Sequence, residues 1–352
     1  MIEQQIKQKD IGPNTFNLSL VSLRIVFMGT PEFAVASLDA LVKAGYNIVG
    51  VITAPDKPAG RGMLLQQSAV KKYAVEHNLK VLQPEKLKNK EFIAELKSLN
   101  ANLQIVVAFR MLPEIVWNMP SMGTVNLHGS LLPQYRGAAP INWAVINGER
   151  ETGVTTFKLK HEIDTGDILL QESFAIGEDE TAGEVHDKMK DIGAQLLVKT
   201  VKGLADGSLQ EKSQEIIIHD LQPAIDNTRV THRQKQMPVD SSFLKHAPKI
   251  NTSTCRVDWS LPAERIYNLI RGLSPYPAAF TILNEKMLKI FKAKKEIIFP
   301  KVTEGDYETD GKTFLKFACE DGYIHLLELQ MEGKKKMEIT EFLRGYRFNS
   351  NQ

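Results

Sequence analysis

An amide, an imidazole and a carboxylate stand out in the middle of the chain because of where they fall among the predicted strands. Asn126 and His128 lie in the strand-like run Val125–His128, and the two-residue period of a strand puts their side chains on one face. Asp164 closes a later apolar-patterned segment, two residues before Gly166, which permits a tight turn. Open α/β sheets bind ligands at the carboxyl ends of their parallel strands. The pattern therefore raises the hypothesis that these three side chains meet at one edge of a sheet.

Together, these three groups suit acyl transfer to an amine. The Asn126 amide can donate a hydrogen bond to the oxyanion that develops on the attacked carbonyl, and losing such a donor typically slows catalysis about 10²–10³-fold. His128 can share that role when charged or carry the proton of the amine, and Asp164 can orient His128 and hold its charged form. A deprotonated amine attacks directly, so no serine or cysteine nucleophile is required. Taken singly, each residue is also typical of a turn or a packed strand.

The first half of the chain alternates predicted strands with predicted helices. Strands are expected at 23–28, 47–53, near 81, at 103–108, 125–128, 154–159 and 168–176, and helices at 33–42, 70–77, 92–99 and 181–204. This alternation indicates βαβ units and a mostly parallel sheet, and right-handed crossovers make the fold α/β and Rossmann-like. Thr181 and Glu184 have the spacing of a capping box at the start of the last helix.

Composition divides the rest of the chain. We expect an N-terminal extension at 1–21, a first domain at 22–207, a linker at 208–228 and a second domain at 229–352. Alternating segments at 287–292 and 324–329 predict that the second domain is small and β-rich. From Arg229 onward, 21 Lys+Arg against 15 Asp+Glu give +6, whereas the 23 basic and 27 acidic residues before it give −4. A basic final third indicates a polyanion partner, although a lysine-rich solvated surface explains the charge equally well.

Several classes of protein are disfavoured by composition. The chain of 352 residues has no apolar run near the roughly 18 residues of a membrane span, and its N-terminus lacks a signal-like apolar stretch. We therefore expect no membrane attachment, and the low cysteine content indicates a reducing compartment and a cytoplasmic protein. No obligate protein partner is evident. Two separated cysteines and eight histidines without zinc-ligand spacing argue against a disulfide scaffold and a structural metal. The turn 28–33 has one glycine, which argues against a nicotinamide dehydrogenase.

Two motifs carry a resemblance to a known family. The stretch 126–133 (NLHGSLLP), followed by 135–141 (YRGAAPI), resembles the signature of folate-dependent formyltransferases, and 164–167 (DTGD) resembles their second motif. The resemblance implies that 10-formyltetrahydrofolate is the formyl donor and co-substrate, that no metal is needed, and that the catalytic residues are Asn126, His128 and Asp164. It further implies that the folate site is shaped by Ser130, Leu131, Leu132 and Pro133 and by the strand end at Ala108 and Phe109.

From residue 24 to about 347 the chain most closely resembles the family members that formylate methionyl initiator tRNA for translation initiation. The stretch 56–62 (DKPAGRG) resembles an inserted loop that grips the acceptor stem, which implies that Lys57 and Arg61 bind tRNA. The stretch 270–277 (IRGLSPYP) resembles the entry to an OB-like β-barrel, a fold suited to nucleic acid.

Two departures from the family and three alternative functions stay open at this point. The loop is neutral at 63–67, so we expect weaker phosphate attraction there than in relatives. Arg110 stands where many relatives carry glycine, and it either alters the rim of the folate site or points into solvent. The formyl acceptor can instead be a sugar-nucleotide amine, which needs no basic second domain, or water, which makes the chain a hydrolase. The third alternative is a non-catalytic RNA-binding protein.

Overall fold

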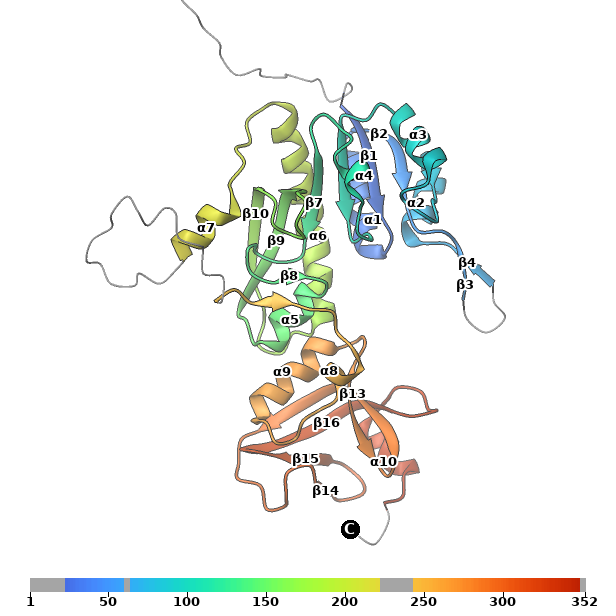
Figure 1. Ribbon diagram of the computed structural model, residues 1–352. Helices are drawn as coiled ribbons and strands as arrows, with labels where there is room; N and C mark the ends of the chain where they lie inside the picture. The colour runs from blue at the N-terminus through green and yellow to red at the C-terminus, as the bar shows by residue number, and fades with distance from the viewer. Residues whose placement is uncertain (1–22, 60–63, 222–242, 349–352) are drawn as a thin grey trace, which may run out of the picture.

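The computed structural model describes residues 23–59, 64–221 and 243–348 (Figure 1). An α/β domain forms the upper part of the molecule in this view, and a smaller β-rich domain lies below it. The expected N-terminal extension at 1–21 lies outside the described residues. No helix in the described ranges is both long and apolar enough to cross a bilayer.

The upper domain is built on a seven-stranded sheet with the strand order β10-β9-β7-β6-β1-β2-β5. Its strands are β1 (Arg24–Gly29), β2 (Asn47–Ile52), β5 (Val81–Leu82), β6 (Leu103–Val107), β7 (Thr124–His128), β9 (Glu151–Lys158) and β10 (Ile168–Ala175). The five strands from β5 to β7 in this order pair in parallel, whereas β9 pairs antiparallel with β7 and β10 pairs antiparallel with β9 at the edge. The expected mostly parallel, Rossmann-like sheet is confirmed.

Helices bury both faces of this sheet, as the alternation of side chains along β1 shows. Ile25 and Phe27 point into one apolar cluster with the helices α1 and α6, while Val26 and Met28 point into a second cluster with α3. The helices are α1 (Glu32–Lys43), α2 (Ala69–Glu76), α3 (Lys90–Ser98), α4 (Glu114–Trp117), α5 (Pro140–Ile146) and α6 (Ala182–Ala205). The predicted capping box starts α6, because Thr181 accepts from the Glu184 backbone N–H and the Glu184 carboxylate accepts from that of Thr181.

A two-stranded hairpin projects from the upper domain (Figure 1). It is formed by β3 (Lys57–Ala59) and β4 (Leu64–Gln66), and it carries the loop that we expected to contact tRNA. Arg61 lies outside the described residues. At the root of the hairpin, the Asp56 carboxylate accepts hydrogen bonds from Lys71 Nζ at 2.5 Å and from Gln83 Nε2 at 2.8 Å.

The segment between the domains has structure of its own. Within the stretch interpreted as a linker, Lys212 forms an antiparallel bridge with Ile168, and α7 (Gln214–Leu221) follows. Further on, β11 (His246–Ala247) pairs in parallel with β8 (Arg136–Gly137) of the upper domain. Both ends of the described interdomain chain therefore pack against the upper domain.

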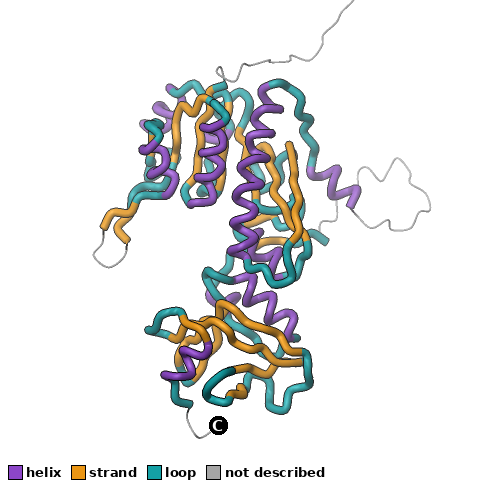
Figure 2. The backbone as a smooth tube through the Cα atoms, turned by 180° about the vertical axis from the view of Figure 1, so that it is seen from behind, coloured by secondary structure: helices purple, strands orange, loops and turns teal. Residues whose placement is uncertain are grey.

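The lower domain is a curled antiparallel sheet with the order β12-β13-β16-β15-β14, and β17 pairs with β16 (Figure 2). Its strands are β12 (Ala279–Leu283), β13 (Lys286–Glu296), β14 (Tyr307–Thr309), β15 (Leu315–Cys319), β16 (Gly322–Met331) and β17 (Met337–Glu338), and its helices are α8 (Thr252–Cys255), α9 (Ala263–Leu273) and α10 (Ile339–Gly345). The expected OB-like, β-rich fold is confirmed.

Helix α9, which our sequence interpretation had not identified, joins the two domains. It packs on β13 of its own domain and on α5 of the upper domain. At Gly272 an added Cβ atom would lie 2.5 Å from the Ile146 side chain, so the close approach of the two helices requires glycine there. Asn142 Nδ2 donates to the Gly272 carbonyl oxygen at 2.8 Å and fixes the contact.

Candidate active site

A cavity of about 530 Å³ opens at the carboxyl ends of β6 and β7. Five of the residues expected from the sequence line it, namely Asn126, His128, Asp164, Ala108 and Phe109. This is the sheet edge at which α/β folds place their ligands. The two-residue period of β7 explains the first two, because the intervening Leu127 and the preceding Val125 are buried in the core on the other side.

His128 is held between a carboxylate and a backbone carbonyl. Its Nδ1 lies 4.0 Å from Asp164 Oδ2, and its Nε2 lies 3.0 Å from the Tyr135 carbonyl oxygen. A carbonyl oxygen only accepts hydrogen bonds, so Nε2 carries the proton in the neutral ring. Nδ1 is then the basic nitrogen, and it faces the carboxylate.

The Asp164 carboxylate has a second fixed contact. Its Oδ2 accepts a hydrogen bond from the Gly137 backbone N–H at 3.0 Å, and its side chain is mostly buried. Asp164 adopts the left-handed region with φ of 56°, which Asp and Asn tolerate better than most residues. The carboxylate is therefore fixed by its own backbone and by the strand β8.

The Asn126 amide is available to a ligand. The side chain is partly buried and makes no hydrogen bond to any of the described residues. It lies on the same face of β7 as His128, two residues away. An imidazole, a carboxylate and a free amide donor thus line one cavity, which is the set of groups that the sequence suggested for acyl transfer.

The four residues expected to shape the folate site do not line this cavity. The Ser130 hydroxyl donates to the Gln134 carbonyl oxygen at 2.7 Å, and Leu132 packs with Phe157 and Ile168 in a small buried cluster. The Leu132 backbone N–H donates to Thr155 Oγ1 at 3.1 Å. The turn at 130–133 is therefore fixed by its own contacts directly after β7 and lies outside the cavity lining.

Arg110 combines features of both sequence alternatives, because it is exposed to solvent and also lies at the cavity. Its guanidinium donates to the carbonyl oxygens of Glu85, at 2.8 Å, and of Pro84, and it lies over the Phe109 ring at 5.7 Å. The side chain is exposed but also lines the cavity. It ties the strand end at Ala108 and Phe109 to the loop after β5.

Several residues beside the catalytic candidates were not predicted as functional. Gln214, at the start of α7, donates to the backbone carbonyl of Asp164, and it also accepts from the Arg136 guanidinium. Burial lowers the pKa of Arg136, an effect that the carboxylates of Asp164 and Glu162 oppose. No periodicity marks Gln214, because it lies in a polar segment and its partners are distant in sequence.

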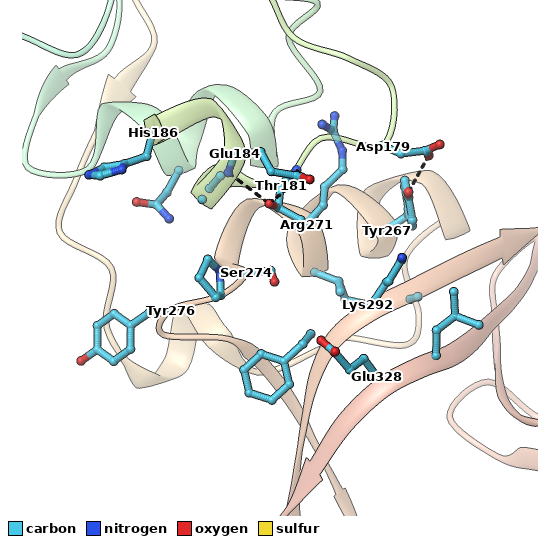
Figure 3. Close-up of a pocket in the computed structure, with 18 of the residues that line it drawn as sticks. Asp179, Thr181, Glu184, His186, Tyr267, Arg271, Ser274, Tyr276, Lys292 and Glu328 are labelled. Atoms are coloured by element: carbon cyan, nitrogen blue, oxygen red, sulfur yellow. Dashed lines mark hydrogen bonds between the residues drawn. The ribbon is translucent and has the colours of Figure 1, made fainter. Parts of the chain in front are cut away.

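A second cavity, of about 1200 Å³, lies between the domains (Figure 3). It shares Ile141, Asn142 and His186 with the first cavity. Its wall includes Arg271 and Lys292 from the lower domain, and the Tyr276 ring stands 82% exposed at its edge. The two cavities are therefore neighbours, and the one between the domains is larger and lined by charged groups.

Two contacts beside this second cavity hold the domains together. The Tyr267 hydroxyl donates to Asp179 Oδ1 at 2.6 Å (Figure 3). Arg271 Nη1 donates to the Glu180 carbonyl oxygen at 3.1 Å. Among the described residues, no three or more His, Cys, Asp or Glu side chains gather where they could hold a metal ion.

Comparison with known proteins identifies relatives of both domains. The family model described as "Formyl transferase" matches residues 23–201, and the model "Formyl transferase, C-terminal domain" matches residues 249–347. A methionyl-tRNA formyltransferase of Bacteroides fragilis is 52% identical over 332 residues, which are 92% of this chain and 95% of the relative. A methionyl-tRNA formyltransferase of Flavobacterium johnsoniae is 48% identical over 331 residues, 93% of this chain and 97% of the relative.

Solved structures share the fold at lower identity. WlaRD, a sugar 3N-formyl transferase, has a TM-score of 0.59 and 20% identity over 89% of this chain and 99% of its own. HypX from Aquifex aeolicus, solved in complex with tetrahydrofolic acid, has a TM-score of 0.59 and 16% identity over 93% of this chain and 48% of its own.

Proposed function

The chain belongs to the formyl transferase family, and from this membership we propose that it transfers a formyl group from 10-formyltetrahydrofolate to the amino group of methionyl initiator tRNA. The observation that carries the chemistry is the meeting of His128, Asp164 and a free Asn126 amide in one cavity at the sheet edge. The observation that carries the acceptor is the identity of about half with methionyl-tRNA formyltransferases over nearly their whole length. The reaction serves translation initiation, and we place it in the cytoplasm.

The Asn126 amide acts on the carbonyl oxygen of the formyl group. The neutral amine attacks the formyl carbon, and the C=O electron pair moves to the oxygen. Asn126 donates a hydrogen bond to that developing oxyanion. Because the amide has no hydrogen-bond partner among the described residues, it does not have to give up an existing bond to do so. The C–N bond to the folate then breaks, and the electron pair returns to re-form the carbonyl.

His128 and Asp164 handle the proton that the amine loses. Nδ1 of His128 is the basic nitrogen of the neutral ring, since Nε2 is bonded to the Tyr135 carbonyl. When Nδ1 accepts the proton, the imidazolium forms 4.0 Å from the Asp164 carboxylate and is stabilised by it. The proton passes on to the folate nitrogen as that nitrogen leaves, which balances the charge.

The folate is held at the strand ends around the same cavity. Ala108 and Phe109, which line this cavity, contact the folate in this proposal, and Arg110 ties that strand end to the loop after β5. Ser130, Leu131, Leu132 and Pro133 act indirectly, by supporting the turn after β7. We propose no metal in this reaction.

The tRNA is contacted by both ends of the molecule. Lys57 at the start of the projecting hairpin approaches the acceptor stem together with Arg61, a residue assigned from the sequence alone, and the basic second domain supplies salt-dependent attraction to phosphates. We retain the division into a catalytic domain at 22–207, a linker at 208–228 and a tRNA-binding domain at 229–352 as part of this proposal.

A panel of acceptors tests the proposal against its alternatives. The folate donor is incubated with methionyl initiator tRNA, the uncharged tRNA, free methionine or a dTDP-amino sugar. We expect formylation of the charged tRNA alone. Equal donor consumption in all samples indicates a hydrolase, formylation of the amino sugar indicates the sugar-nucleotide alternative, and tRNA binding in a gel shift without any transfer indicates a non-catalytic RNA-binding protein.

A further inference from the structure

One glutamine from the interdomain segment has every hydrogen-bonding position of its side chain in use. Gln214 is 1% exposed. Its Nε2 donates to the carbonyl oxygens of Asp164, at 2.9 Å, and Gly166, at 2.8 Å. Its Oε1 accepts from Arg136 Nε at 3.1 Å and Nη2 at 2.6 Å. A primary amide has two donor hydrogens and two acceptor lone pairs, so none is left over.

These four bonds join the two backbone segments that hold the Asp164 carboxylate. On one side is the turn that carries Asp164 itself, and on the other is the strand β8, whose Gly137 N–H donates to Asp164 Oδ2 at 3.0 Å. Gln214 bridges the turn to Arg136, the residue next to Gly137. A shift of either segment changes the 4.0 Å distance between the carboxylate and His128 Nδ1.

Gln214 is itself anchored against the edge of the sheet. Lys212 exchanges two backbone hydrogen bonds with Ile168 of β10, at 2.8 and 2.9 Å. Ile217 packs against the small cluster that contains Ile168, and Ile218 is 5% exposed. The start of α7 therefore has a fixed position, and its glutamine transmits that position to the turn.

The other end of the interdomain segment holds β8 from the opposite edge. The Tyr135 and Ala138 N–H groups donate to the carbonyl oxygens of Lys245 and Ala247 at 2.6 and 2.7 Å. Tyr135 is the residue whose own carbonyl bonds to His128. Gly137 has φ of 130°, and an added Cβ would lie 2.4 Å from the Ala247 oxygen, so β11 leaves no space beside it.

We propose that Gln214 is a positioning residue for formyl transfer, which sets the Asp164 carboxylate against His128 by bridging the Asp164 turn to Arg136. This inference rests on the proposed function. The segment between the domains then has a role in catalysis in addition to connecting the domains.

Substitution of Gln214 by Met tests the proposal, because Met has similar length and makes none of the four bonds. A small misplacement of a catalytic group is enough to slow a reaction substantially, so we expect kcat to fall about 10- to 100-fold. The KM values for tRNA and for folate should stay within about twofold, because Gln214 lines neither cavity. In an Asp164→Asn background the same substitution should cost less than about threefold, since the two residues act as one unit.

Thr200→Val is the matched control for the loss of a buried hydrogen bond. Thr200 is fully buried, its hydroxyl lies 2.8 Å from that of Thr156, and neither residue lines either cavity. We expect this variant to lose thermal stability and to keep parental kcat.

Three outcomes overturn the inference, provided that the parental chain is active. The first is a Gln214→Met variant with kcat within about twofold of parental. The second is a Thr200→Val variant of equal thermal stability whose kcat falls as far as that of Gln214→Met. The third is a fall in kcat on adding Gln214→Met to Asp164→Asn that is as large as the fall in the parental chain. If the Met variant does not fold, Gln214→Glu keeps an acceptor for Arg136 but sets a carboxylate oxygen against the carbonyls of Asp164 and Gly166. The same fall in kcat is expected, and parental kcat in this variant overturns the inference. A parental chain that transfers no formyl group contradicts the proposed function instead.

Discussion

Asp164→Asn removes the charge beside His128 while leaving the local structure in place. Asn tolerates the left-handed backbone of this position as Asp does, and its side-chain oxygen can still accept from Gly137 N–H at the present 3.0 Å. The substitution therefore isolates the electrostatic contribution of the carboxylate to the imidazolium that forms during transfer.

The magnitude follows from the distance between the two groups. His128 Nδ1 and Asp164 Oδ2 are 4.0 Å apart. Two unit charges at about that distance attract by about 4 kcal/mol at an effective dielectric constant near 20. Because each 1.36 kcal/mol corresponds to a factor of ten, kcat should fall by about 10³-fold. KM for methionyl-tRNA should change little, since the charge on the ring develops only as the amine reacts.

Single-turnover formyl transfer with saturating folate donor measures this effect. Asp167→Asn is the control, because Asp167 belongs to the same motif but pairs with Lys160 Nζ at 2.8 Å and does not line the cavity. We expect that variant to stay within about twofold of parental, as exposed pairs contribute little. An Asp164→Asn enzyme that retains a third or more of parental kcat would refute the role given to the carboxylate.

Three further predictions concern other parts of the molecule. Gly137→Ala places a Cβ atom 2.4 Å from a carbonyl oxygen of β11 and should lower both the melting temperature and kcat, whereas an unchanged melting temperature argues against the tight contact. Lys71→Met removes the ion pair of Asp56 at the root of the hairpin and leaves only its bond from Gln83, so it should raise KM for tRNA with little change in kcat in steady-state assays; an unchanged KM contradicts a role of the hairpin in tRNA binding. Burial raises the pKa of the Cys255 and Cys319 thiols and so lowers the fraction present as reactive thiolate. Iodoacetamide at mildly alkaline pH should therefore alkylate both thiols slowly in the native protein and rapidly in urea. Rapid alkylation of the native protein would contradict their burial.

The sequence predicted the elements whose apolar pattern is regular. The parallel strands and α6 with its capping box were identified because burial on both sheet faces and helical periodicity leave clear signals. The antiparallel pairing of β9 with β7 and of β10 with β9 was not predicted, since a strand's direction is set by its connection and not by its own residues. Helix α9 was missed because we identified the second domain from its alternating segments alone.

The parts of the candidate site that depend on residues close together in the sequence were predictable, and the parts that depend on contacts between distant residues were not. The period of β7 places Asn126 and His128 together, whereas their link to Asp164 was a hypothesis from the strand pattern that the family resemblance strengthened. Gln214 left no signal because a single polar residue in an aperiodic segment looks like any linker residue, and its partners lie 48 to 78 positions away. That Ser130 to Pro133 lie outside the cavity lining was likewise visible only in three dimensions.

Transfer of a labelled formyl group from 10-formyltetrahydrofolate to purified methionyl initiator tRNA tests the central claim most directly. We predict that label appears in acid-precipitable tRNA, that digestion releases it as formyl-methionine, and that His128→Ala lowers the rate severely in a correctly folded protein. Label that never enters the tRNA, or a His128→Ala variant with near-parental turnover, would contradict the account.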